Sequence, residues 1–181
     1  MFSILLLISL SSPAQDAPAQ SRTSVASDSL PPGSVTETPH LTLTTAVAGE
    51  PVAPGTRVSL LVDITPKPKM HVYAPQQKEY IPLSITLDPN SALTAQRSVF
   101  PKPEKLFFAP LKETQLVYSK PFRIVLNVLL APAVRTARDV SAGELKVTGR
   151  IRYQACDDAI CYLPKDVPVS WTIRLKSVAV Q

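Results

Sequence analysis

The chain is 181 residues long, which is enough for one domain. Its 19 prolines exclude a mostly helical bundle, because proline breaks helix interiors, and its 5 glycines exclude collagen. The formal net charge is +5, but lysine and arginine are spread along the chain without a dense run, so the sequence does not indicate a nucleic-acid-binding protein. The cysteines, Cys156 and Cys161, and the histidines, His40 and His71, are too scattered for a structural zinc site. We expect no metal and no cofactor.

The N-terminus has the composition of an export signal. Residues 2–10 are mostly apolar, and small residues follow as far as Ala14. This pattern is typical of a signal peptide and its cleavage site, and the run is shorter than the roughly 20 residues that span a bilayer. A buried N-terminal strand is the alternative interpretation. We predict a signal peptide over residues 1–14, a periplasmic or otherwise exported protein, and no transmembrane segment in this chain.

Residues 15–40 have the composition of a linker. Proline, serine, threonine and alanine dominate this segment, and it holds no aromatic residue. Such a sequence cannot bury enough apolar surface to offset the entropy of ordering it. We therefore predict a disordered linker over residues 15–40 and a folded domain over residues 41–181. Removal of residues 15–38 is expected to leave the thermal stability nearly unchanged.

The remaining sequence predicts an all-β domain. Apolar and polar residues alternate with period two in several segments, which places one face of each strand on a core and the other in water. Turn signals rich in glycine and proline separate these segments, and seven to nine short strands at this spacing are typical of a β-sandwich. The expected strands cover residues 41–47, 58–65, 70–73, 81–88, 93–99, 122–130, 145–153 and 167–175. We also expect Trp171 to lie in the core.

The candidate chemistry lies at the two cysteines. Cys156 and Cys161 are separated by four residues, between a strand that ends at Tyr153 and one that begins near Val167. In an exported protein they are expected to form one intramolecular disulfide. Closing so short a loop stabilises a fold by only about 2 kcal/mol in the chain-entropy model. Two interpretations follow: an exchangeable redox pair, or a structural staple.

Three segments resemble one protein family. Residues 153–164, which contain both cysteines, resemble the active-site segment of the N-terminal periplasmic domain of the thiol:disulfide interchange protein DsbD. Residues 70–75, with the proline-containing strand 81–83, are similar to the family's His-x-Tyr region. Residues 100–108, followed by Tyr118 and the strand from Phe122, resemble the loop that caps the disulfide with an aromatic ring. The three segments occur in the family's order.

The resemblance implies an immunoglobulin-like antiparallel β-sandwich with a redox cysteine pair at one end. It implies a thiol-disulfide oxidoreductase that carries electrons. A thioredoxin-like protein or a membrane electron-transfer protein would reduce the domain, which would then reduce oxidised periplasmic proteins. Cys161 would form the mixed disulfide with the partner, and Cys156 would resolve it. The alternative is a non-redox immunoglobulin-like binding module with a structural disulfide.

Several side chains are candidates for the surroundings of the disulfide. Phe107 or Phe108 would form the aromatic cap, and both could instead belong to the core. His71 is a candidate catalytic base or a half-buried strand residue. Tyrosines near the cysteines could flank the disulfide or simply pack on the strands; they are Tyr73, Tyr153 and Tyr162.

Two acidic residues follow Cys156 directly. The carboxylates of Asp157 and Asp158 disfavour a nearby thiolate and are expected to raise the pKa of the thiols. The reduced pair would then be a weak nucleophile until a partner docks. The alternative is that both aspartates are solvated turn residues without influence on the cysteines.

Overall fold

The computed structural model describes residues 33–177. These residues form thirteen β-strands and one 3-10 turn, η1 (Val134–Thr136). No helix in this part of the chain is long and apolar enough to cross a membrane. The predicted signal peptide, most of the predicted linker and residues 178–181 lie outside the described residues.

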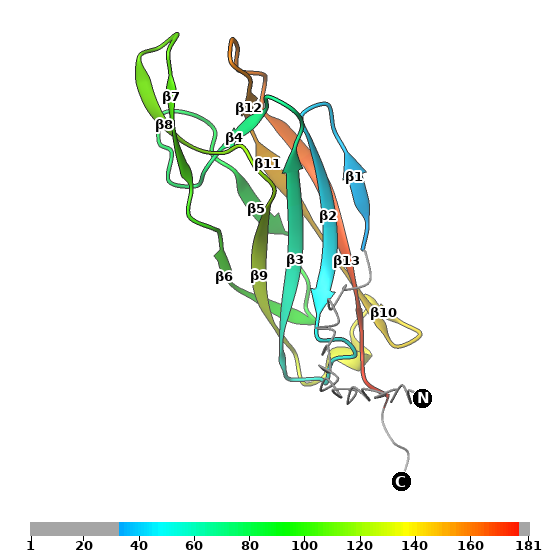
Figure 1. The fold of residues 1–181 in the computed structure, drawn as a ribbon. Helices are drawn as coiled ribbons and strands as arrows, with labels where there is room; N and C mark the ends of the chain where they lie inside the picture. The colour runs from blue at the N-terminus through cyan, green and yellow to red at the C-terminus, as the bar shows by residue number, and fades with distance from the viewer. Residues whose placement is uncertain (1–32, 178–181) are drawn as a thin grey trace, which may run out of the picture.

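The first sheet has five antiparallel strands. Its order is β1 (Val35–Glu37), β2 (Leu41–Ala48), β3 (Arg57–Pro66), β9 (Phe122–Leu130) and β6 (Leu93–Val99) (Figure 1). The pairing of β2 with β3 runs without interruption over eight residue pairs, and that of β3 with β9 is equally regular. Buried and partly exposed residues alternate along β9, so one face of this sheet covers the core, as the period-two pattern predicts.

The second sheet packs against the first. Its long strands are β11 (Glu144–Tyr153) and β13 (Lys165–Arg174), which pair over ten residues. The other edge of β11 pairs with β10 (Val140–Ser141) and β5 (Ser84–Leu87). A Cβ atom on Gly149 would lie 2.5 Å from the carbonyl oxygen of Thr86, so only glycine permits β5 to approach here. The fold is an immunoglobulin-like antiparallel β-sandwich, as expected.

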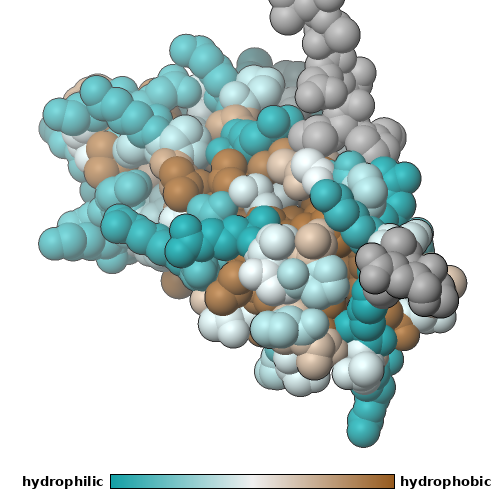
Figure 2. Space-filling model, turned by 90° about the horizontal axis from the view of Figure 1, so that it is seen from below, coloured by the Kyte–Doolittle hydropathy of each residue, from teal (hydrophilic) through white to brown (hydrophobic). Residues whose placement is uncertain are grey.

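A third, smaller sheet stands at one end of the sandwich, at the top of Figure 1. Its order is β12 (Ala155–Cys156), β4 (His71–Tyr73), β8 (Glu113–Tyr118) and β7 (Glu104–Phe108). It contains Cys156. The opposite end of the molecule, seen in Figure 2, presents mainly hydrophilic residues with apolar ones visible between them.

Trp171 links the two large sheets. Its indole is buried in the core, which confirms the prediction, and its Nε1 donates a hydrogen bond of 3.0 Å to the carbonyl oxygen of Leu61. The bond joins β13 to β3, so it ties one sheet to the other from within the apolar interior. A buried indole needs such an acceptor, because an unpaired N–H in this environment is costly.

The predicted strands are confirmed, with one shortened. The segment expected over residues 81–88 forms a strand only from Ser84, because Pro82 lacks the N–H that a ladder requires. The expected number of strands is too low, since the described residues contain thirteen. The strands that sequence patterns did not predict are short or lack clear alternation: β1, β7, β8, β10 and β12.

The predicted linker is wrong for its last residues. β1 pairs antiparallel with β2 from Val35 to Glu37, so the segment before His40 belongs to the sheet. The Thr38 hydroxyl donates to the carbonyl oxygen of Leu41 at 2.9 Å and accepts from the Tyr153 hydroxyl at 3.0 Å. His40 is buried. Strand addition and side-chain hydrogen bonds order this stretch, and a composition rich in proline and serine does not reveal either of them.

We therefore expect truncation of the chain before Pro39 to destabilise the domain. The truncation removes β1 and the bond from Tyr153 to Thr38. At a net contribution of about 1 kcal/mol per hydrogen bond and about 2–4 °C per kcal/mol for a domain of this size, the loss of two such bonds alone lowers the melting temperature by roughly 4–8 °C, so we expect at least this decrease. Differential scanning calorimetry measures the change. A chain that begins at Gly33 retains β1 and is the control; equal melting temperatures for the two would contradict a structural role for β1.

Candidate functional site

The pairing of β12 with β4 positions the cysteine segment. Cys156 lies opposite His71 and Ala155 lies opposite Val72 in this two-residue antiparallel ladder. The side chain of Gln154, the residue before β12, bonds the backbone of two neighbouring segments. Its Oε1 accepts from the Ile81 N–H at 3.2 Å, and its Nε2 donates to the Tyr162 carbonyl at 3.1 Å. The backbone of this segment is thus fixed on both sides of the cysteines.

Cys156 and Cys161 form a disulfide, which confirms the prediction. Their Cα atoms are 4.0 Å apart. The loop between them closes on itself, because the N–H of Asp157 donates to the carbonyl of Ile160 and that of Tyr162 donates to Ala155. The two sulfurs lie in different surroundings: Cys156 is 0% exposed, whereas Cys161 is an exposed residue. Cys161 is therefore the more accessible of the two residues.

The Tyr73 hydroxyl bridges both sulfurs. Its oxygen lies 3.1 Å from Cys156 Sγ and 3.2 Å from Cys161 Sγ. Oxidised sulfurs carry no proton, so the hydroxyl is the donor. Burial, together with Tyr80 and Glu113, raises the pKa of Tyr73, so the phenol stays protonated. The arrangement supplies a fixed hydrogen-bond donor that favours negative charge on sulfur.

Behind Tyr73 lies a polar network that the sequence analysis did not predict. Tyr80 stacks on Tyr73 with ring centroids 4.4 Å apart, and its hydroxyl donates to the Glu113 carboxylate. Gln115 donates to the same carboxylate at 2.7 Å. These two hydrogen bonds lower the pKa of Glu113 and keep it ionised. β8 places Glu113 and Gln115 on one face. The sequence could have indicated these two residues only if β8 had been predicted as a strand.

Apolar side chains seal the buried sulfur. Cys156 packs with Tyr73 and Val117, and Tyr80 and Leu106 lie against this cluster. Leu106 comes from β7, the strand that carries the predicted cap. Of the two predicted cap residues, Phe107 is 63% exposed and Phe108 is 6% exposed. Neither ring belongs to the cluster around Cys156.

The predicted tyrosines occupy three different environments. Tyr73 touches the disulfide, as described. Tyr153 is buried in the main core and its hydroxyl bonds Thr38, away from the sulfurs. Tyr162 follows Cys161 and donates a hydrogen bond of 2.7 Å to Asp157. Its ring packs against that of His40, with the centroids 4.5 Å apart and the ring planes tilted by 35°. His40, which was assigned to the linker, therefore supports the cysteine loop.

Asp157 organises the cysteine loop. Its carboxylate accepts hydrogen bonds from the N–H groups of Ala159 and Ile160, both at 2.8 Å, and from the Tyr162 hydroxyl. The Ile160 and Tyr162 bonds, with that of Ala159, lower the pKa of Asp157 to about 2. Asp157 is thus a turn residue whose carboxylate hydrogen-bonds within the loop, whereas Asp158 is exposed.

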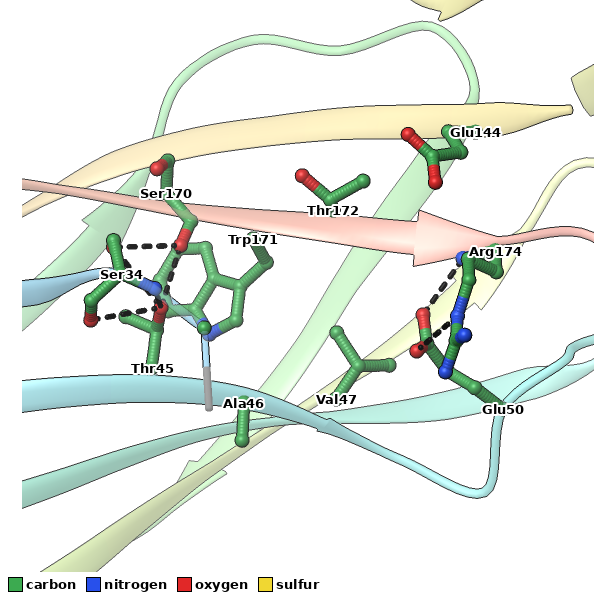
Figure 3. Close-up of a pocket in the computed structure, with 11 residues that line it drawn as sticks. Ser34, Thr45, Ala46, Val47, Glu50, Glu144, Ser170, Trp171, Thr172 and Arg174 are labelled. Atoms are coloured by element: carbon green, nitrogen blue, oxygen red, sulfur yellow. Dashed lines mark hydrogen bonds and ion pairs between the residues drawn. The ribbon is translucent and has the colours of Figure 1, made fainter. Parts of the chain in front are cut away.

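A pocket of about 360 Å³ lies between β2 and β13. Figure 3 shows paired polar groups at its two ends: Thr45 donates to the Ser170 carbonyl at 2.7 Å at one end, and Glu50 pairs with Arg174 at the other. Neither cysteine lines it. Over residues 33–177, no group of three or more His, Cys, Asp or Glu side chains is placed to hold a metal ion.

Comparison with known families identifies the domain. The model of the family described as thiol:disulfide interchange protein DsbD, N-terminal, matches residues 40–170. The chain belongs to this family. The matched residues include the disulfide and the strands β4 and β8, so the whole candidate site lies within the part of the chain that matches the family. The chain is accordingly a thiol:disulfide interchange domain with a cysteine pair, and the family is consistent with an exported protein.

A solved structure of TM-score above 0.5 agrees on the fold. The N-terminal periplasmic domain of ScsB from Proteus mirabilis superposes with a TM-score of 0.52 at 15% identity, over 78% of this chain and 51% of that one. This chain thus spans about half the length of the ScsB domain. The N-terminal domain of Neisseria meningitidis DsbD in the reduced form has a TM-score of 0.41 at 14% identity, over 64% of this chain and 82% of that one. No curated protein sequence matches the chain.

The hydrogen bonds of Asp157 predict a stability difference that depends on pH. We expect Asp157→Asn to lower the melting temperature at neutral pH, because an amide cannot accept from all three donors as an ionised carboxylate does. The folded pKa of about 2 is below the unfolded value of about 3.9. The stabilisation is therefore present above the unfolded pKa and is lost as the pH falls through the folded one.

Thermal denaturation of both proteins between pH 7 and pH 2 measures this difference. The two melting temperatures should converge as the carboxyl group is protonated. Asp158→Asn is the matched control, since Asp158 lies beside Asp157 and is exposed. A gap of constant size down to pH 2 would show that Asp157 does not act through its ionised form.

Proposed function

We propose that this domain is a periplasmic thiol:disulfide interchange carrier. It receives electrons from a thioredoxin-like protein or a membrane electron-transfer protein and passes them to oxidised periplasmic proteins. The observation that supports this function best is the asymmetry of the disulfide, with Cys161 exposed, Cys156 buried and the Tyr73 hydroxyl between the sulfurs. One sulfur is open to exchange and the other is protected from it.

The asymmetry gives each cysteine a role. In the reduced domain, the Cys161 thiolate attacks a sulfur of the partner's disulfide and releases one partner thiolate, which forms a mixed disulfide. The Cys156 thiolate then attacks Cys161 Sγ and releases the second partner thiolate. The domain is oxidised to the disulfide and the partner is reduced to two thiols, so two electrons have moved. Reduction of the domain by its donor is the same sequence in reverse.

Exposed apolar side chains lie on both sides of the accessible cysteine in the sequence. Ile160 precedes Cys161 and is 55% exposed, and Leu163 follows it and is 86% exposed. Phe107 and Leu111, on the β7–β8 hairpin at the same end of the molecule, are also exposed (Figure 1). Exposed apolar groups that gather at one place indicate a docking surface. We propose that partners pack on Ile160 and Leu163 when their sulfur reaches Cys161.

A structural disulfide in a binding module is the competing interpretation. The closed loop is short, with a sequence separation of 5, so the bond contributes little stability through chain entropy. The reduction potential discriminates between the two. A value near those of known interchange proteins supports exchange, whereas a value below about −300 mV supports a staple.

Trapping of mixed disulfides tests the assignment of roles. We expect Cys156→Ser to accumulate a mixed disulfide with a thioredoxin-like protein whose resolving cysteine has been replaced by serine and whose remaining cysteine has been activated with DTNB. The exposed Cys161 thiolate displaces thionitrobenzoate from the partner sulfur, and no second cysteine resolves the new bond. Cys161→Ser should trap little, because Cys156 is fully buried. Non-reducing gel electrophoresis with mass spectrometry measures the adduct.

The outcomes separate the interpretations. If Cys161→Ser traps the partner as well as Cys156→Ser does, the assignment of roles to the two cysteines is wrong. No trapping by either would favour the structural disulfide. The double variant, with both cysteines replaced by serine, is the control for adducts that do not involve this pair.

Docking on the cysteine loop predicts partner-specific rates. We expect Leu163→Asp to slow reduction of the domain by a thioredoxin-like protein at least about fivefold, the equivalent of about 1 kcal/mol of lost apolar contact. Reduction by dithiothreitol, which needs no docking surface, should change little. Leu129→Asp is the matched control, because Leu129 is also partly exposed but lies opposite Arg57, where β3 begins far from the disulfide. Equal slowing with both reductants would disprove the docking role.

A further inference from the structure

His71 lies across the strand pair from the buried sulfur. In the ladder of β12 and β4, Cys156 and His71 are direct partners. Directly opposed residues of an antiparallel pair place their side chains on the same face, with Cβ atoms typically about 5 Å apart. The side chain of His71 is thus a neighbour of Cys156, and with 3% exposure it is equally removed from water.

The imidazole of His71 has an unused nitrogen. Among the described residues, Nε2 has no hydrogen-bond partner although it is buried, and the same is true of Gln115 Oε1. Most buried polar atoms in proteins are paired, because an unpaired one destabilises the fold. No hydrogen bond of normal geometry from the described residues occupies this nitrogen, and the Gln115 amide favours the protonated imidazole, so a neutral His71 can accept a proton.

Cys156 needs such a group. As the resolving cysteine it must become a thiolate before it can attack, and its burial keeps water from taking the proton. Tyr73 cannot serve, because its pKa is raised and its hydroxyl is a donor. Glu113 is ionised, but it is already engaged by Tyr80 and Gln115. Among the described residues, His71 is the titratable residue that lies directly opposite Cys156 in the ladder.

We propose that His71 is the base that takes the proton from the Cys156 thiol when this thiol resolves the mixed disulfide on Cys161. The assignment rests on the proposed interchange function. His71 accepts the proton, and the Cys156 thiolate attacks Cys161 Sγ. The bond between Cys161 and the partner sulfur breaks as the bond between Cys156 and Cys161 forms. The partner leaves as a thiol with the proton that His71 held, which returns His71 to its neutral form.

The charges around His71 suit this exchange. Burial lowers the pKa of His71, so the imidazole is neutral and able to accept a proton near neutral pH. Asp158, Gln115 and Asp157 act in the opposite direction and favour the protonated form. The proton transfer therefore produces an imidazolium that two carboxylates and an amide stabilise, beside a thiolate that the Tyr73 hydroxyl can stabilise.

Reaction of the reduced domain with the aromatic disulfide DTNB tests the proposal. Attack by Cys161 releases one coloured thiolate in a first phase, and resolution by Cys156 releases a second. In the wild type we expect the second phase to be independent of pH above the pKa of His71 and to slow as the pH falls below it. In His71→Gln the second phase should rise about tenfold per pH unit and be at least about tenfold slower at pH 7, the lower range for loss of a general base. The first phase should be unchanged.

The controls separate a base from a structural residue. Added imidazole should restore the second phase in His71→Ala, which a packing defect would not allow. Cys156→Ser should show the first phase only.

The possible failures are distinguishable. If the wild type shows both phases and His71→Gln retains the wild-type rate and pH profile, the proposal is wrong while the interchange function stands. If the His71 variants do not fold, the wild type decides: a second phase that rises about tenfold per pH unit throughout, without a plateau, overturns the role of His71. If the reduced wild type releases no thiolate, the interchange function itself fails.

Discussion

The two-residue pairing of β12 with β4 is the constraint on which the site depends. It places Ala155 and Val72 in the main core, and Cys156 on the opposite face with Tyr73. Side chains alternate along a strand, so a shift of one residue would exchange the environments of Ala155 and Cys156. The burial of one sulfur, the exposure of the other and the contact of both with the Tyr73 hydroxyl all follow from this register.

The turn that carries Cys161 does not rely on the disulfide for its shape. Asp157 accepts from two N–H groups of the loop and from Tyr162, while the Tyr162 ring packs against His40. These contacts involve neither sulfur, so opening the bond removes none of them directly. Cys161 then stays close to Cys156, and resolution of a mixed disulfide is an intramolecular step with a high effective concentration. The loop thus keeps the exposed Cys161 close to Cys156, which must attack it.

Sequence patterns predicted the sandwich but only part of the site. Strands such as β9 and β13 alternate clearly, and the cysteine pair was evident from its spacing. Glu113 and Gln115 could not be predicted, because β8 lacks clear alternation and lies 38 or more residues before Cys156 in the sequence. The role of His40 was hidden for a different reason: its segment is ordered by pairing with β2, which local composition does not encode.

The core of the domain and the redox site are physically separate. Trp171 and the long strands form one large apolar cluster, whereas Cys156 belongs to a small one with Tyr73 and Val117. Because the disulfide closes a short loop, it restricts the unfolded chain little, and its loss costs the fold little. Reduction of the disulfide is therefore expected to leave the packing of the main core unchanged. A bond that contributed strongly to folding would resist reduction and could not serve as a carrier.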